Sequence, residues 1–423
     1  MQERNRDSVR RGQYIMKRSI KTANRIGGLD AWIMVAPTVI ATLLIVVATP
    51  AQAQTYTVLH TFTSGTDGAY PLAAVTMDGT GTLYGTASGG GYTAGDCGSD
   101  GCGTVFKLTQ HGSGWLFAPL YSFTGSTLDD GAFPSAPVIV GPDGALYGTT
   151  SSGGNGHGTV FRLTPPASLC KGFSCPWTET VLYRFLGGND GAYPGYGPLV
   201  FDQAGNIYGT TQYGGPANLG TVFKLTPSHG GRVESILYGF TAADGGQPLS
   251  GVIFDSAGNL YGTASVCCVY ELSPSQSGWQ YQNIYGFQGG RGGTNPTGGV
   301  VFDSSGNLYG TTFNDGGTAY VLRPSNGTWN LTTLYSFNAY AGPLDTPTLD
   351  AEGNIYGTVF DLVSGGIVFK LTRSNGWLES TVTDFGGFGQ PAGSVILDAN
   401  GNIYGTIELG GTDGYGAVFE VTP

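Results

Sequence analysis

The sequence has few charged residues and no long runs of the helix formers Ala, Glu, Lys and Leu. Asp, Glu, Lys and Arg make up only 11% of its 423 residues, whereas 74 residues are Gly, 24 are Tyr and 21 are Phe. The missing helix-forming runs argue against a helical or α/β fold. The residues that replace them indicate many short strands joined by glycine-rich turns.

Basic residues are scarce beyond the first 53 positions. Those positions hold eight of the 18 Lys and Arg residues, then an apolar stretch at 32–48 and Ala51-Gln52-Ala53. This order is typical of a secretory signal peptide, so we predict cleavage after residue 53 and a secreted, periplasmic or extracellular location. An uncleaved signal anchor is the alternative. The remaining chain carries 10 basic and 26 acidic residues, a net charge of −16. That charge disfavours nucleic acid and anionic membrane surfaces as partners.

Cysteine is rare as well, and its six residues form three local pairs. The pairs are Cys97 with Cys102, Cys170 with Cys175, and Cys267 with Cys268. Export makes a disulfide the default for the first two pairs. Zinc is the alternative, but Cys-x4-Cys without a second pair or a nearby His pair suits zinc poorly, so we predict no metal. The adjacent third pair is compatible with a vicinal disulfide or with two buried thiols.

One motif, Leu/Ile-Tyr-Gly-Thr, occurs seven times along the chain. Its tyrosines are spaced by 63, 61, 53, 48, 47 and 48 residues, so the basic unit is 48 residues long. They are Tyr84, Tyr147, Tyr208, Tyr261, Tyr309, Tyr356 and Tyr404. A period of roughly 40 to 50 residues with four short strands is typical of a propeller blade. In the third copy we expect strands at 198–202, 206–211, 221–227 and 233–240.

The two ends of the repeat array are offset by one strand. Residues 55–62 resemble the fourth strand of a unit, whereas residues 416–423 resemble the third. The first strand can therefore complete the last sheet and remove the exposed edges of an open array. We predict one all-β domain over residues 54–423. Its expected fold is a seven-bladed β-propeller of four-stranded antiparallel blades, closed by the N-terminal strand joining the C-terminal blade.

The motifs Gly-Asn-Leu-Tyr-Gly-Thr-Thr at 306–312 and Gly-Thr-Val-Phe-Lys-Leu-Thr-Pro at 220–227, with the glycines between such segments, carry a family resemblance. They resemble the bacterial GloVer tandem-repeat proteins over residues 56–423, and NHL or streptogramin-lyase-like propeller repeats more distantly. The resemblance implies an exported protein, often with a separate C-terminal surface anchor, and it implies no biochemical activity. Because no sorting signal or hydrophobic tail follows the last repeat here, we do not expect covalent surface attachment.

Several other positions recur in the units. We interpret a Phe at the end of each fourth strand as an anchor of the core between blades, and the Gly of the motif as a point of close backbone approach. A Pro recurs in the next loop, at Pro71, Pro134, Pro194, Pro248, Pro296, Pro347 and Pro391. An Asp opens the first hairpin of five units, at Asp202, Asp255, Asp303, Asp350 and Asp398. Calcium would need six or more oxygens, so capping of the turn amides explains this Asp better.

The loops between the fourth strand of one unit and the first strand of the next carry the candidate ligand-binding residues. Three copies read Asp-Gly-Ala-Tyr/Phe-Pro, the fourth reads Asp-Gly-Gly-Gln-Pro, and later copies degrade, as in Asp345-Thr-Pro347. These loops, and the glycine loop that contains His157, are expected around the axial opening. There they could bind a sugar by hydrogen bonds and stacking, or a cation. The alternative is that Asp-Gly only turns the chain and the aromatic ring covers the blade edge. The candidates are Asp67, Tyr70, Asp130, Phe133, His157, Asp190, Tyr193 and Asp244.

Motifs for catalysis are nearly absent. The four histidines are scattered, and there is no His pair, His-Asp-Ser order or nucleophile elbow. No helix follows the glycine loops to bind phosphate. We therefore predict a monomeric, non-catalytic binding module without a cofactor, whose ligand is an extracellular polysaccharide or protein. A lyase or hydrolase with an axial pocket is the first alternative, although fold alone supports it weakly. A structural envelope component is the second.

Overall fold

The structure is a computed structural model that describes residues 54–423 except 126, 167–175, 230, 315, 338–340, 362–364, 374–375, 387–388 and 392. The predicted signal peptide lies outside the described residues. Within the described part of the chain, no helix is long and apolar enough to cross a membrane. The helical segments there are three short 3-10 turns, η1 (Gly95–Asp100), η2 (Ala242–Asp244) and η3 (Gly290–Gly292).

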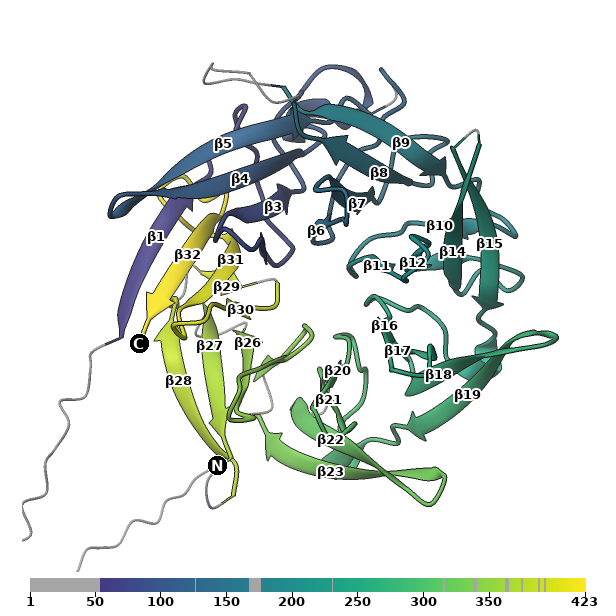
Figure 1. The fold of residues 1–423 in the computed structure, drawn as a ribbon. Helices are drawn as coiled ribbons and strands as arrows, with labels where there is room; N and C mark the ends of the chain where they lie inside the picture. Colours follow the sequence, from purple (N-terminus) through teal and green to yellow (C-terminus); the bar gives the residue numbers. More distant parts are fainter. Residues whose placement is uncertain are drawn as a thin grey trace, which may run out of the picture. The chain divides into compact units, whose positions relative to one another are not determined.

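Seven antiparallel sheets surround a central axis, which confirms the predicted propeller (Figure 1). Each blade has a two-residue strand innermost and its longer strands outside. Blades 1 to 4 consist of β2 (Thr76–Met77), β3 (Leu83–Ala87), β4 (Thr104–His111) and β5 (Gly114–Ser122); β6 (Ile139–Val140), β7 (Leu146–Thr150), β8 (Thr159–Thr164) and β9 (Thr178–Arg184); β11 (Val200–Phe201), β12 (Ile207–Thr211), β14 (Thr221–Ser228) and β15 (Gly231–Gly239); and β16 (Ile253–Phe254), β17 (Leu260–Ala264), β18 (Cys268–Ser275) and β19 (Gly278–Gly286).

Blades 5 to 7 continue the same order around the axis. They consist of β20 (Val301–Phe302), β21 (Leu308–Thr312), β22 (Thr318–Ser325) and β23 (Thr328–Ser336); β25 (Thr348–Leu349), β26 (Ile355–Asp361), β27 (Gly365–Thr372) and β28 (Leu378–Asp384); and β30 (Ile396–Leu397), β31 (Ile403–Leu409), β32 (Ala417–Thr422) and β1 (Thr55–Thr61). Short rim strands add to blades 3, 6 and 7: β10 (Gly191–Ala192) with β13 (Tyr213–Gly214), β24 (Ala341–Gly342), and β29 (Gln390–Pro391).

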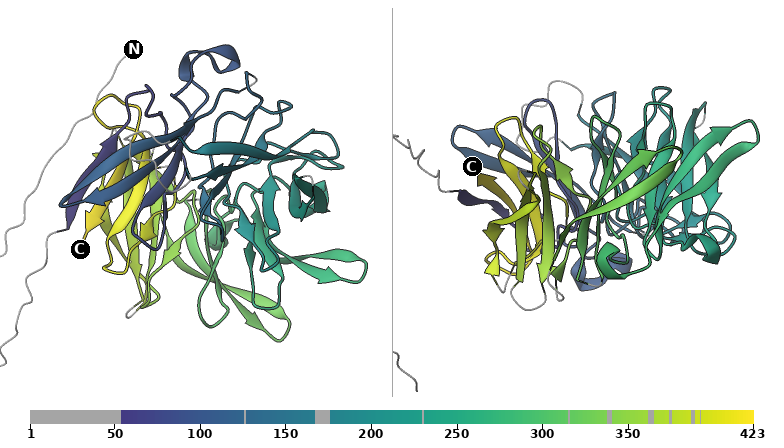
Figure 2. Two further views of the ribbon diagram at one scale, coloured as in Figure 1. Left: turned by 45° about the horizontal axis from the view of Figure 1, so that its top comes forward. Right: turned by 90° about the horizontal axis from the view of Figure 1, so that it is seen from below.

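The N-terminal strand closes the ring as predicted. β1 pairs antiparallel with β32, with Thr55 opposite Thr422 and Thr61 opposite Ala417. Figures 1 and 2 show the purple first strand beside the yellow last strand. The edge of β32 is therefore covered by a strand from the other end of the described chain.

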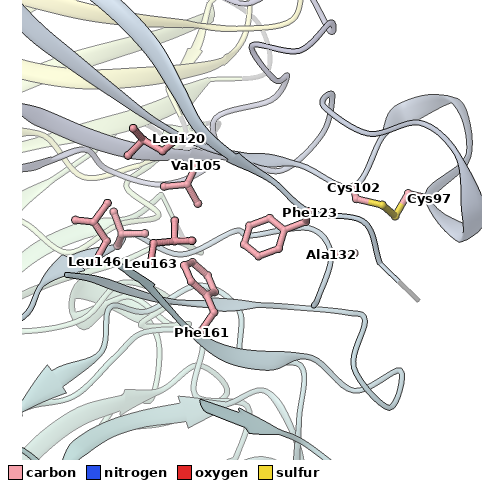
Figure 3. Close-up of a cluster of buried hydrophobic side chains, with 10 residues drawn as sticks. Cys97, Cys102, Val105, Leu120, Phe123, Ala132, Leu146, Phe161 and Leu163 are labelled. Carbon is pink, nitrogen blue, oxygen red and sulfur yellow. A yellow bond between two sulfur atoms is a disulfide. The ribbon is translucent and has the colours of Figure 1, made fainter. Parts of the chain in front are cut away.

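The hydrophobic core lies in the gaps between blades. The structure has seven buried clusters, and each combines side chains of two neighbouring blades. In the gap between blades 1 and 2, Phe123 packs edge-on against Phe161 with ring centroids 5.1 Å apart (Figure 3). The equivalent seven ring pairs have centroids 4.9 to 5.3 Å apart. This confirms that the recurring Phe anchors one blade to the next.

The Gly and Tyr of the repeated motif have separate packing roles. A Cβ atom at Gly209 would lie only 2.7 Å from the Phe223 ring, so this position admits no side chain. The Tyr208 hydroxyl donates to the Asp202 carboxylate, which also accepts the backbone amides of Ala204 and Asn206 at 2.9 Å. The predicted capping of the turn by this Asp is therefore confirmed.

The cysteines of the described residues are all disulfide-bonded. Cys97 is bonded to Cys102, as predicted, and this bridge packs in the gap between blades 1 and 2 (Figure 3). Cys267 is bonded to its neighbour Cys268 at the start of β18, which decides between the two alternatives for that pair.

The second predicted disulfide, between Cys170 and Cys175, is not among these bridges. Both Cys170 and Cys175 lie in the segment 167–175, outside the described residues. The bond between them therefore stays a prediction from the sequence, on the same ground of export that predicted the first bridge.

Two predictions about strand and loop register were wrong. The first strand of blade 3 covers only Val200–Phe201, because only these two residues pair with the second strand, as in every other blade. In blade 6, the recurring proline is Pro343 and not Pro347. A Cβ at Gly317 would lie 3.1 Å from Pro343 Cδ, and the recurring prolines of other blades cover the equivalent glycines in the same way. Asp345 therefore does not belong to the turn position that its sequence context suggested.

Candidate functional site

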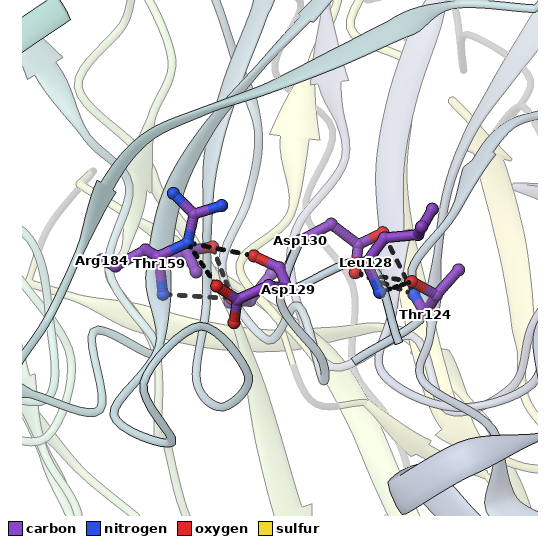
Figure 4. Close-up of polar contacts among 7 residues, drawn as sticks. Thr124, Leu128, Asp129, Asp130, Thr159 and Arg184 are labelled. Atoms are coloured by element: carbon purple, nitrogen blue, oxygen red, sulfur yellow. Dashed lines mark hydrogen bonds and ion pairs between the residues drawn. The ribbon is translucent and has the colours of Figure 1, made fainter. Parts of the chain in front are cut away.

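The four predicted aspartates lie in the loops that follow the outermost strands, and each bonds to its own turn. Asp130 is buried and accepts hydrogen bonds from the Tyr121 hydroxyl at 2.6 Å and from the Thr124 amide at 3.0 Å. Figure 4 shows Asp130 turned toward Thr124, whereas its neighbour Asp129 faces Arg184. The other three accept from a side chain of the preceding strand and a turn amide: Asp67 from His60 and Thr63, Asp190 from Tyr183 and Leu186, and Asp244 from Tyr238 and Thr241.

The predicted rim aromatics tie neighbouring blades together at the same loops. Tyr70, Phe133 and Tyr193 have backbone φ values of 56°, 57° and 56°. The Tyr193 amide donates to the His157 carbonyl at 2.9 Å, and the two rings meet edge-on with centroids 6.3 Å apart. The structure thus brings His157 and Tyr193 together. None of the eight predicted residues lines the axial cavity, so ligand binding by them stays a prediction.

The axis of the ring contains a cavity of about 630 Å³ that all seven blades line. Its walls come from the innermost strands, the loops that lead into them, and the ends of β12, β26 and β31. Leu, Val, Ile, Pro, Ala and Gly make up most of the lining. Of the described residues that line it, none is Lys, Arg or His.

One ring of positions around this cavity is occupied by small residues in six blades. We call it the inner ring: it lies three residues before the first residue of each innermost strand. Its members are Ala73, Ala136, Gly197, Ser250, Gly298, Asp345 and Gly393. In all blades but one, the Thr of the repeated motif in the preceding blade lies within hydrogen-bond distance of the carbonyl of this position, as Thr210 does from Ser250 at 2.7 Å. The exception in size and charge is Asp345.

Asp345 joins the frame of the ring and also faces the cavity. Its carbonyl accepts the Thr311 hydroxyl at 2.9 Å, and its carboxylate accepts the Thr358 hydroxyl at 3.1 Å. Burial raises the pKa of Asp345 to about 7, although the bond from Thr358 opposes the shift. Part of its surface remains accessible because it faces the cavity, while protein surrounds it on the other sides. The sequence pattern missed it because Pro347 was taken for the recurring proline. Counting three residues back from Thr348, the first residue of the innermost strand, gives this position.

A second ring of positions lies four residues after each motif Tyr, and its side chains also differ between blades. It consists of Ser88, Ser151, Gln212, Ser265, Phe313, Phe360 and Glu408, of which Gln212, Phe360 and Glu408 line the cavity. Burial raises the pKa of Glu408. Blade 3 also contributes Tyr196, an extra residue before its first strand whose surface is 54% exposed.

These side chains make the cavity asymmetric. Gln212 and Tyr196 come from blade 3, whereas Asp345 and Glu408 come from blades 6 and 7. Figure 1 shows β11 and β12 of blade 3 across the axis from the strands of those two blades. The cavity thus has one side with both carboxyl groups, next to Phe360 and Gln390, and an opposite side with Gln212 and Tyr196 and no carboxyl group in the described lining.

A closed ring of seven four-stranded blades around an axial cavity defines a seven-bladed β-propeller. The chain belongs to the Gloeobacter/Verrucomicrobia repeat family, whose model matches residues 44–267. This confirms the family resemblance drawn from the repeated motifs. No curated protein matches the sequence.

Some solved structures are similar to this chain at low sequence identity. A candidate 6-phosphogluconolactonase of Bacteroides uniformis is 15% identical with a TM-score of 0.46, and the match covers 80% of this chain and 94% of that chain. A gluconolactonase of Xanthomonas campestris is 13% identical with a TM-score of 0.40, covering 87% and 89%. Likeness at this level carries no inference about the activity of this chain.

Proposed function

We propose that the protein is an exported, non-catalytic binding module that takes its ligand into the axial cavity. The observation that carries the proposal is the cavity of about 630 Å³ with polar groups on two opposite sides. Sites for small ligands usually have volumes of about 300 to 1,000 Å³, mostly apolar walls and a few placed polar groups. The Cys97–Cys102 disulfide supports export, since such bonds persist in oxidising compartments.

The proposed ligand is the end of an extracellular polysaccharide or a projecting segment of a protein. A cavity of this size admits a chain end or a few side chains, and not a whole domain. The exposed Tyr196 ring offers a stacking surface, and Gln212 an amide that can donate and accept hydrogen bonds. The loops with Tyr70 and Tyr193 could add contacts to the parts of a large ligand that stay outside.

The proposal is tested by filling the cavity. Ser394 lines it and has no hydrogen bond among the described residues, so Ser394→Trp should block entry without removing a contact. Ser228→Trp, at the exposed end of β14 in blade 3, is the matched control. Glycan arrays, polysaccharide pull-downs and protein capture should detect a ligand that the unmodified protein and the control retain and that Ser394→Trp loses. Retention of the same ligand by Ser394→Trp would place binding elsewhere.

A hydrolase or lyase is the second candidate, because two carboxyl groups with raised pKa values line the same cavity. Asp345, with a pKa raised to about 7, can donate or accept a proton near neutral pH, and burial raises the pKa of Glu408 as well. Turnover of any substrate in a broad screen, lost in both Asp345→Asn and Glu408→Gln, would favour an enzyme. Binding of a ligand without its turnover would favour the non-catalytic binding module.

A further inference from the structure

The charge at Asp345 has no structural partner in the ring. Six blades build the inner ring with Ala, Gly or Ser. In four of them, blades 1, 3, 4 and 7, the Thr hydroxyl of the second strand bonds to a backbone carbonyl of the next blade. In blade 4 the residue is Ser250, whose hydroxyl lies 2.8 Å from the hydroxyl of its own Thr263. Asp345 makes the equivalent contact with Thr358. A serine would satisfy this neighbour, so the frame of the propeller does not require a carboxylate here.

The surroundings of Asp345 do not neutralise it. In the described part of the chain its carboxylate accepts one hydrogen bond, from a neutral hydroxyl, and forms no salt bridge. The other carboxyl group in the described lining is that of Glu408, which adds negative charge and does not compensate it. A buried charge that lacks a partner in the protein is costly, and a ligand of opposite charge can supply the partner.

The walls beside these carboxyl groups combine apolar and aromatic side chains with the neutral polar residues Thr346, Gln390 and Ser394. Phe360 lies at the end of β26 in the same blade as Asp345, and Leu344 precedes Asp345 in the chain. An aromatic face can contribute to binding of a cation in addition to a carboxylate. The fitting ligand therefore has a positively charged head and a compact apolar body.

We propose that Asp345 binds the cationic group of the ligand, an organic ammonium or guanidinium, while the apolar walls hold its body. This inference rests on the proposed function, since it concerns the same cavity. The cation can belong to a free amine or to a Lys or Arg side chain of a protein. Both sources present the same chemistry to Asp345.

The test compares probes of equal shape and different charge. Isothermal titration calorimetry at pH 8 should show that the affinity for the 2-phenylethylammonium ion exceeds that for neutral 2-phenylethanol by a factor of about ten or more. The reason is that the ammonium ion forms a hydrogen bond between charged groups with Asp345, which the alcohol cannot form. Asp345→Ser should remove this preference, since Ser250 already occupies the equivalent place in blade 4. Asp413→Ser removes an exposed charge from the rim loop and should keep the preference. A peptide with one Lys, compared with its norleucine version, tests a protein source.

Further outcomes separate this inference from the proposed function. If Asp345→Ser fails to fold, Asp345→Asn replaces it, since it removes the charge and keeps the size of the side chain: loss of the preference for 2-phenylethylammonium supports the inference, and an unchanged preference overturns it. If both probes bind with equal affinity and Asp345→Ser does not change it, the cation site is wrong. If Ser394→Trp then loses binding of both probes, the cavity remains the binding site. If Ser394→Trp still binds every ligand, both the cation site and the proposed function are wrong.

Discussion

The Thr406 hydroxyl donates a 2.9 Å hydrogen bond to the carbonyl of Ala73, although 333 residues separate them. It joins blade 7 to blade 1 near the axis, whereas β1 and β32 join the two ends of the chain at the outside. Equivalent bonds link most other neighbouring blades. They run from Thr86 to Ala136, Thr210 to Ser250, Thr263 to Gly298 and Thr311 to Asp345, and Thr358 reaches the Gly393 carbonyl in the same way when its single proton is not donated to the Asp345 carboxylate. The exception is Thr149, whose buried hydroxyl has no partner among the described residues. Thr149 belongs to blade 2, and the loop that leads into the inner strand of blade 3 is one residue longer than its equivalents.

Replacing Thr406 should therefore weaken the protein, whereas the same change at Thr149 should not. Thr406→Val keeps the shape of the side chain and leaves the Ala73 carbonyl without this donor, which should cost about 1 to 3 kcal/mol of unfolding free energy. Thr149→Val removes a hydroxyl that is already unsatisfied and should be neutral or stabilising. Urea unfolding of both variants measures the difference, and equal losses would contradict a role for this bond.

Two tyrosines at the packing position of the third strand carry buried hydroxyls without partners. Tyr270 and Tyr320 are fully buried, and no hydrogen bond reaches either hydroxyl in the described structure. The other five blades have Phe at this position. Tyr270→Phe and Tyr320→Phe should each raise the unfolding free energy by about 1 kcal/mol or more, because each removes an uncompensated desolvation cost.

A matched control for these variants is Tyr208→Phe. Its hydroxyl does have a partner, the Asp202 carboxylate at 2.9 Å, so the same chemical change should lower stability there. Denaturant titrations of the three variants under one set of conditions make the comparison. A loss of stability in Tyr270→Phe would show that this hydroxyl has a bound water as its partner.

Glu179 should make the protein less stable as the pH rises. Burial, and then the charge of Asp130, raise the pKa of Glu179 to about 8 in the folded state, whereas the ordinary value is 4.5. Between these values the unfolded chain releases a proton that the folded protein keeps, so stability falls with rising pH and levels off above pH 8. The slope should stay below about 1.4 kcal/mol per pH unit, the limit for one proton, because Glu179 is partly exposed.

Glu179→Gln should make this slope shallower and raise stability most at pH 8. It should not abolish the slope, since burial also raises the pKa of Glu234 to about 7. Glu352→Gln, in an exposed turn, is the charge-matched control. Thermal unfolding from pH 4 to 9 tests the prediction, and a slope of the same size in Glu179→Gln and unmodified protein would refute it.

The fold could be predicted from the sequence because every blade meets the same neighbours. The motif Tyr208-Gly209-Thr210 shows this: the Tyr bonds to the hairpin Asp, the Gly lies against an aromatic ring, and the Thr bonds to the next blade. The Tyr and Gly requirements recur in all seven blades and the Thr bond in most of them, so they appear as repetition in the sequence. The offset between the two ends of the array predicted the closing strand for the same reason.

The cavity could not be predicted in this way, because it depends on the positions where blades differ. Asp345 stands where other blades have Ala, Gly or Ser, and its neighbour Pro347 suggested the wrong register. Tyr196 enters the lining through a loop that is one residue longer than its equivalents. The aspartates that do repeat, such as Asp130, were the visible candidates, and the structure finds them bonded within their turns.

The paired ends of the chain predict that the ring can be opened elsewhere. Thr422 lies opposite Thr55, so the two could be joined through a turn of two residues, as Ser228 and Gly231 are in blade 3. A permuted domain that joins Thr422 to Thr55 through Asn-Gly, a favoured sequence for two-residue hairpins, and starts at Ser277 keeps every strand pair. The new ends lie in the exposed turn between β18 and β19.

The free energy of unfolding of this permuted domain should lie within about 1 kcal/mol of that of the domain 54–423, since cuts in exposed turns are well tolerated. Deleting residues 54–62 should behave differently. It uncovers the edge of β32 and removes the Phe62 ring from its contact with Phe106, so the protein should lose stability and self-associate. Urea unfolding and sedimentation compare the three forms. A deleted form that stays monomeric and equally stable would mean that strand pairing at the outside does not close the ring. The bonds near the axis, such as that of Thr406 with Ala73, would then have to be sufficient to hold blade 7 against blade 1.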